Sequence, residues 1–137
     1  MKISYSVKEI IRLSLEEDIG NGDITSSLLI PEESESRAII IAKANFVVAG
    51  LPFVNEVFSV LDPGVKVKVF MEDGTRVAKG DRIAEVYGKT RSVLAGERVS
   101  LNILQRLSGI ATLTNMFVEK VKGLDAKIVD TRKTTPG

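Results

Sequence analysis

Hydrophobic and polar residues recur with a helical period at the start of the chain. Apolar residues repeat at helical spacing across residues 6–17, with Ser6 as the expected N-cap and Glu9 three positions later. Turn-forming residues in "DIGNGD" end this pattern. The following "DITSSLLI" begins with capping residues and ends before Pro31, so we expect a short second helix there.

After residue 35 the hydrophobic pattern predicts strands, and from residue 51 it again predicts a helix. Residues 36–50, "SRAIIIAKANFVVAG", are β-branched and apolar without a helical period, which predicts one or two mostly buried strands. Residues 51–62 regain helical spacing, with Pro52 near the first turn, and Pro63-Gly64 ends that helix.

A strand-rich unit is expected next. Strict alternation in "VKVKVF", residues 65–70, predicts a half-exposed strand, and the turn signals Asp73-Gly74 and Lys79-Gly80-Asp81 bracket further short strands. Residues 72–86 resemble the compact unit of biotinyl and lipoyl carrier domains and of hammerhead folds. A carrier needs a lysine presented at a hairpin tip, and Lys43 and Lys79 lack that setting, so an architectural unit is the favoured interpretation.

One long helical pattern covers about residues 93–122 and ends at Gly123, a suitable C-cap. Residues 127–130 then predict a strand. A lone strand has no sheet to join, and a barrel-type domain needs roughly 200 further residues, so we expect a truncated chain. The expected fold is an α+β sandwich over residues 1–110, followed over residues 111–137 by the start of an incomplete β/α barrel.

Composition narrows the function classes. The chain has 137 residues, 44% of them hydrophobic and 27% charged, which is typical of one globular domain. Lys and Arg (19) nearly cancel Asp and Glu (18), so the broad basic field of a nucleic-acid binder is absent. With neither Cys nor His, thiol chemistry and the commonest general base are excluded. No signal peptide or membrane-length apolar run is visible, so a cytoplasmic protein is expected.

The segment "DTRKTTPG" is the first candidate for chemistry. Strand ends hold the sites of α/β folds, and here Arg132 supplies a planar fork and Lys133 a point charge for a carboxylate or phosphate. Thr131 and Thr134 flank them and can add hydroxyl or backbone donors. A solvated basic surface turn fits the same residues.

The second candidate is "GERVSLNILQRLSGIAT". We expect Arg98 in the first turn of the long helix, where the macrodipole opposes cations, so it either pairs with Glu97 or another acid or faces an anionic ligand. Gly109 costs helix stability, which predicts close approach by another element or a second subunit. In "EEDIGNGDIT", capping by Asp23 or Thr25 is favoured over a metal loop, because calcium-ligand spacing is absent.

Three of these segments together resemble the quinolinate phosphoribosyltransferase family: "EDIGNGDIT", "GERVSLNILQRLSGIAT" and "DTRKTTPG" occur in the family's order and approximate spacing. The resemblance implies a hammerhead-like N-terminal sandwich followed by an incomplete β/α barrel. It implies transfer of phosphoribose from phosphoribosyl pyrophosphate to quinolinate, giving nicotinate mononucleotide, pyrophosphate and carbon dioxide.

The resemblance also implies site residues and partners. Arg98 would reach into the neighbouring protomer's site, making a homodimer the smallest competent unit, while Arg132 and Lys133 would line the site at the first barrel strand with Thr131 and Thr134. Mg2+ would accompany the phosphoribosyl donor through ligands beyond this chain. Two alternatives stay open: the molybdenum-transport-associated relative of the same superfamily, and a non-catalytic carrier or assembly module.

Overall fold

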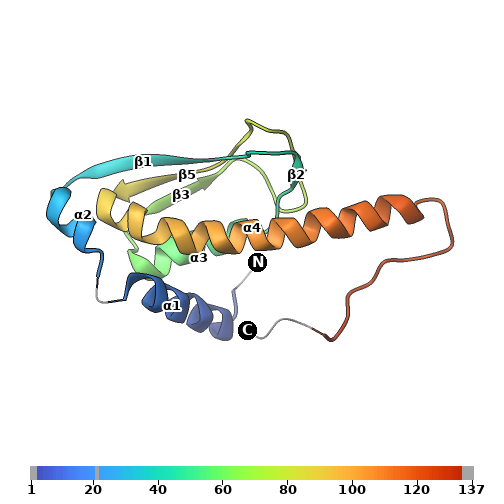
Figure 1. Ribbon diagram of the computed structural model, residues 1–137, viewed down its shortest axis with the longest axis horizontal. Coiled ribbons are helices and arrows are strands. Elements are labelled where there is room, and N and C mark those ends of the chain that lie inside the picture. Colours follow the sequence, from blue (N-terminus) through green and yellow to red (C-terminus); the bar gives the residue numbers. More distant parts are fainter. Residues whose placement is uncertain (1–2, 21, 134–137) are drawn as a thin grey trace.

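The computed structural model describes residues 3–20 and 22–133 as an α+β fold with a small sheet and one long helix (Figure 1). In chain order the elements are α1 (Tyr5–Ile19), α2 (Ile24–Leu29), β1 (Glu35–Ile41), β2 (Phe46–Val47), α3 (Leu51–Leu61), β3 (Lys66–Val69), β4 (Arg76–Val77), β5 (Arg82–Lys89) and α4 (Thr90–Val121). The predicted α+β class is confirmed. No helix among the described residues has the length and apolar content needed to cross a bilayer.

The main sheet has three antiparallel strands in the order β1-β5-β3, and β2 and β4 form a separate two-stranded pair. Helices cover one face of the main sheet (Figure 1). Along β1, exposed residues alternate with half-buried ones, because only one face of this antiparallel sheet is covered. The prediction of mostly buried strands over residues 36–50 is therefore wrong for β1, although Val47 and Val48 in and after β2 are buried.

The helices α3 and α4 form a middle layer with an apolar core on each side. Toward the sheet, α3 buries Val54 and Phe58 in a cluster that includes Val86 of β5. Toward α1, the same helix buries Val57 against Ile11 and its neighbours. The long helix contributes to both cores, so its position is fixed relative to the sheet and to α1.

Gly109 is not the glycine at which α4 is closely approached. Among the described residues, no neighbouring atom lies within 4 Å of the position that a Gly109 Cβ would take, so the predicted approach by another element of this chain is wrong. The close approach is at Gly96, where an added Cβ would lie 2.5 Å from Cε1 of Phe58. Because Phe58 is buried, Gly96 is the residue that lets α4 lie on α3.

Gly96→Ala and Gly109→Ala should therefore have opposite effects in the same helix. We expect Gly109→Ala to raise the free energy of unfolding by about 1 kcal/mol, since alanine is the better helix former. Gly96→Ala should lower it by about 1–3 kcal/mol, because overpacking against Phe58 outweighs that gain. Urea unfolding of both variants checks this, and equal stabilities would contradict the packing described for Gly96.

Two hydroxyl groups of α4 hold the β2 region against the helix. Ser108 Oγ accepts a hydrogen bond from the Ala49 backbone N–H at 3.0 Å and donates to the Ala49 carbonyl at 3.2 Å. One turn later, Thr112 Oγ1 accepts from the Val47 N–H at 2.9 Å and donates to the carbonyl of Ser108. The helix side chains thus satisfy backbone groups that a sheet neighbour would otherwise pair.

Ser108→Ala should consequently destabilise the chain by about 1–3 kcal/mol, because it leaves the N–H and the carbonyl of the half-buried Ala49 without their partner. Ser108 is 4% exposed, so water does not readily replace the lost hydroxyl. Ser59→Ala, on the exposed face of α3, is the matched control and should change stability by less than about 0.5 kcal/mol. Equal unfolding midpoints for the two variants would refute this account of the β2 region.

The predicted starts of two helices, α1 and α4, need correction. Ser4, not Ser6, caps α1, since its side chain accepts from the Val7 N–H; Glu9 pairs with Arg12 instead of forming a capping box. At the other end of the chain, α4 starts at Thr90 directly after β5, so Arg98 lies in the third turn and not the first.

The predicted strand over residues 127–130 is not formed in the described structure. The segment after α4 is irregular and exposed, with Val129 75% exposed. No described strand lies beside it, so its backbone groups have no ladder to join. The C-cap of α4 is Lys122 and not the predicted Gly123, which follows it in the left-handed conformation at φ 87° that ends many helices. The boundary between residues 1–110 and 111–137 stays a prediction.

Candidate functional site

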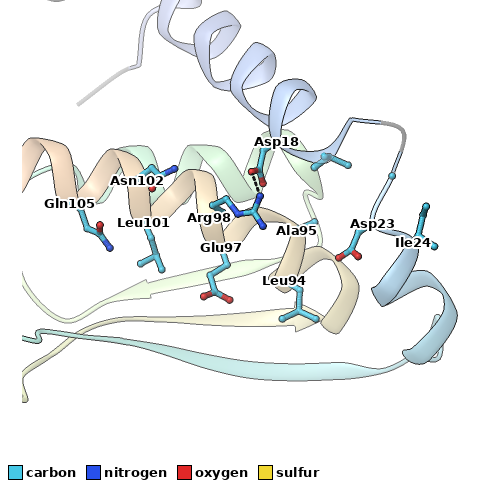
Figure 2. A pocket seen from close by; sticks show the side chains of 12 residues that line it. Asp18, Asp23, Ile24, Leu94, Ala95, Glu97, Arg98, Leu101, Asn102 and Gln105 are labelled. Atoms are coloured by element: carbon cyan, nitrogen blue, oxygen red, sulfur yellow. Dashed lines mark hydrogen bonds and ion pairs between the residues drawn. The ribbon is translucent and has the colours of Figure 1, made fainter.

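The site is built around one ion pair between residues far apart in sequence. Nη1 of Arg98, on α4, lies 2.7 Å from Oδ1 of Asp18, in the last turn of α1 and 80 residues earlier (Figure 2). The Arg98 side chain is 73% exposed, whereas that of Asp18 is 20% exposed. The expected pairing of Arg98 with an acid is confirmed, and the acid is Asp18; Glu97 points away from the pair in Figure 2.

This pair contributes little to folding stability. An ion pair with an exposed partner is worth about 0–1 kcal/mol. The C-terminal turn of a helix is also unfavourable for an acid by about 0.3–1 kcal/mol, and the last turn of α1 contains no basic residue to offset it. The dipole argument applies to Asp18 and not to Arg98, because Arg98 lies two turns inside α4. The placement of Asp18 is therefore explained better by the position of Arg98 than by stability.

A pocket of about 550 Å³ opens beside the pair, between α4 and the chain that leads from α1 into α2 (Figure 2). Its charged lining consists of three carboxylates and one guanidinium, and two residues further along α4 add amides. These side chains are Asp18, Asp23, Glu97, Arg98, Asn102 and Gln105. Since the acids outnumber the single cation, this lining alone does not favour a polyanion, and an anionic ligand requires further positive groups.

Asp23 in the same pocket caps α2. Its Oδ1 accepts from the Ser26 backbone N–H at 2.9 Å, and its Oδ2 accepts from the Ser26 hydroxyl at 2.5 Å. The hydrogen bond from the Ser26 hydroxyl makes the largest contribution to lowering the pKa of the Asp23 carboxyl below its usual value, and the bond from the Ser26 N–H lowers it further. The charge of Arg98 adds a smaller effect in the same direction. Capping by Asp23 is confirmed, so "EEDIGNGDIT" both starts α2 and brings Asp18 and Asp23 to one pocket.

The other predicted site residues lie in the segment that leaves the far end of α4 (Figure 1). Thr131, Arg132 and Lys133 are exposed, and the Thr131 hydroxyl accepts from the Lys133 backbone N–H at 2.8 Å. Within residues 3–20 and 22–133, neither cationic side chain of this segment forms an ion pair or contacts Arg98. Thr134 lies outside the described residues. Within this one chain, "EDIGNGDIT" and "GERVSLNILQRLSGIAT" therefore meet through Asp18 and Arg98, whereas the described residues of "DTRKTTPG" lie apart from them.

Sequence reasoning missed Asp18 as the partner of Arg98. The sequence does contain a hint of this role, because Asp18 is an acid near the end of a predicted helix, close to the glycines of "EEDIGNGDIT". What periodicity does not supply is the packing of α1 against α3 and α4, which brings the two residues together.

Known proteins resemble this chain in sequence. The family model described as "Quinolinate phosphoribosyl transferase, N-terminal domain" matches residues 23–108. A probable nicotinate-nucleotide pyrophosphorylase [carboxylating] of Bacillus subtilis is 44% identical over 131 residues, which are 96% of this chain and 45% of that protein. A mitochondrial quinolinate phosphoribosyltransferase [decarboxylating] of Nicotiana tabacum is 41% identical over 98% of this chain and 38% of its own length.

Solved structures show the same similarity. The nicotinate-nucleotide pyrophosphorylase from Francisella tularensis has a TM-score of 0.89 and 38% identity, covering 98% of this chain and 49% of that one. The corresponding protein from Ehrlichia chaffeensis has a TM-score of 0.88 and 40% identity, covering 100% of this chain and 49% of its own. This chain spans half or less of the length of these relatives. Sequence and fold agree, and the chain belongs to the quinolinate phosphoribosyl transferase family.

Proposed function

We propose that this chain supplies the N-terminal part of an enzyme that transfers phosphoribose from phosphoribosyl pyrophosphate to quinolinate. The products would be nicotinate mononucleotide, pyrophosphate and carbon dioxide. The observation that carries the proposal is the match of residues 23–108 to the family's N-terminal domain, with Arg98 exposed at the edge of a pocket in that domain. In the described residues the Arg98 guanidinium uses Nη1 alone, so its other donors remain for a carboxylate or phosphate.

The charge of the pocket supports a site shared between protomers. Both substrates are polyanions, and binding them in a shielded site requires several fixed cations. The lining of the pocket contributes Arg98 as its single cation against three carboxylates. We propose that Arg132 and Lys133 of a second protomer supply the missing positive charge, and that Thr131 and Thr134 add hydroxyl contacts. A homodimer is then the smallest complete unit, with Arg98 lent by one protomer to the other.

Mg2+ does not fit the residues described here. Among residues 3–20 and 22–133, no group of three or more acidic side chains is arranged to hold a metal ion. Asp18 is engaged by Arg98, and Asp23 is engaged by Ser26. We therefore derive no step through the metal. The association of Mg2+ with phosphoribosyl pyrophosphate stays a proposal, as do the cytoplasmic location and the hammerhead-like description of residues 72–86, which contain β4 and most of β5. The tobacco relative is named as mitochondrial.

An assay of the full-length gene product tests the function. We expect nicotinate mononucleotide to form only when quinolinate and phosphoribosyl pyrophosphate are both present, and the 137-residue chain alone to form none. Quinolinate titration also separates this function from the molybdenum-associated relative, which should not respond. A full-length protein without quinolinate-dependent product would contradict the proposal. An intact mass carrying a lipoyl or biotinyl group would instead support the carrier alternative.

A further inference from the structure

We infer that Asp18 is a positioning residue that holds the Arg98 guanidinium in place for an anionic substrate. This inference rests on the proposed function, because it assigns Asp18 a role through Arg98 and not through contact with the substrate. The contact that carries it is the 2.7 Å pair between Asp18 Oδ1 and Arg98 Nη1, which joins α1 to α4 across 80 residues of sequence.

The geometry leaves Arg98 held but still available. Asp18 is the better shielded partner, at 20% side-chain exposure, and it lies on a helix whose core side is packed against α3 and α4. The Arg98 side chain is 73% exposed, so the pair with Asp18 leaves most of it open to solvent. A long arginine side chain loses considerable rotamer freedom when it binds a ligand. A carboxylate that orders this side chain beforehand removes part of that loss, which strengthens ligand binding.

Structural stabilisation is a weaker explanation for the pair. Asp18 opposes the dipole at the C-terminal turn of α1, and an exposed ion pair adds little to folding. Elsewhere on α4, the pair between Glu119 and Arg76 also joins the helix to another element, at 2.9 Å and with comparable exposure of its arginine. That pair lies away from the pocket and therefore provides a matched control.

A second explanation is that Asp18 competes with the substrate for Arg98. The two roles predict opposite effects of removing the carboxylate charge. Loss of a positioning group weakens substrate binding, whereas loss of a competitor strengthens it. The sign of the change in KM therefore separates the two roles.

The experiment compares Asp18→Asn, Arg98→Ala and the double variant in the full-length gene product, by steady-state kinetics with both substrates. For Asp18→Asn we expect the KM of at least one substrate to rise about three- to tenfold while kcat stays within about twofold. In the Arg98→Ala background, the same substitution should add nothing, because the residue through which it acts is gone. Glu119→Gln should leave both constants unchanged.

Three outcomes would overturn the inference: an unchanged KM, a lowered KM, or an equal rise in the presence and absence of Arg98. Unfolding midpoints of all variants show whether a kinetic change reflects lost folding. A wild-type protein that forms no product would reject the proposed function itself. An active wild type with an unaltered Asp18→Asn variant would reject the positioning role alone.

Discussion

Phe58→Ala is expected to lower the free energy of unfolding by about 3–5 kcal/mol. Phe58 is 2% exposed and is among the largest fully buried side chains of the described residues. Its ring fills the space between α3, the sheet and the point where Gly96 brings α4 close. Alanine would leave a cavity there, and surrounding residues on three different elements would have to move to fill it.

Urea unfolding of the 137-residue chain, followed by circular dichroism, measures this effect. Phe117→Ala is the matched control, because the same side chain is removed from a position on α4 that is 52% exposed. We expect the control to cost less than about 1 kcal/mol. A loss of similar size in both variants would mean that the core between α3, α4 and the sheet is not organised around Phe58.

The largest functional effect is expected at the cationic residues. Arg98→Ala and Arg132→Ala, each made in the full-length gene product, should lower kcat/KM for quinolinate at least about tenfold, since each removes a charge-assisted contact to a polyanion. For Arg98 the structure shows an exposed guanidinium with unused donors at the pocket. For Arg132 the expectation rests on the family motif and on its exposure in the described chain.

Arg76→Ala is the control for these substitutions. Arg76 is also an exposed arginine paired with one acid, at 63% side-chain exposure, but it lies outside the pocket. It should leave kcat/KM within about twofold of the wild type. Activity unaffected by Arg98→Ala would remove Arg98 from the site, and a loss of equal size in all three variants would indicate damage to the fold.

Most of the fold was predictable because its elements follow local rules. Alternation in "VKVKVF" and helical spacing in residues 51–62 correspond to β3 and α3 within a residue or two. The start of α4 was placed too late because β5 runs into it without a loop, so no turn residue marks the boundary. The strand over residues 127–130 was wrong because an apolar segment becomes a strand only beside a partner strand.

The site was less predictable than the fold. The pair of Asp18 with Arg98 and the hydroxyl contacts of Ser108 and Thr112 to the β2 region join positions that are distant in sequence. Such contacts depend on how helices pack, which neither periodicity nor capping specifies. The relation of Arg98 to Arg132 and Lys133 depends in addition on a second protomer, so it stays a proposal.

That shared site has a direct test in a mixing experiment. Full-length Arg98→Ala and Arg132→Ala proteins are assayed separately, and then after dissociation and reassociation in equal amounts. If Arg98 serves the partner's site, each mixed dimer contains one site with neither substitution, and activity should return to about a quarter of the wild-type value. A mixture with no more activity than the average of its two components would contradict a site completed by Arg98 from the neighbouring protomer.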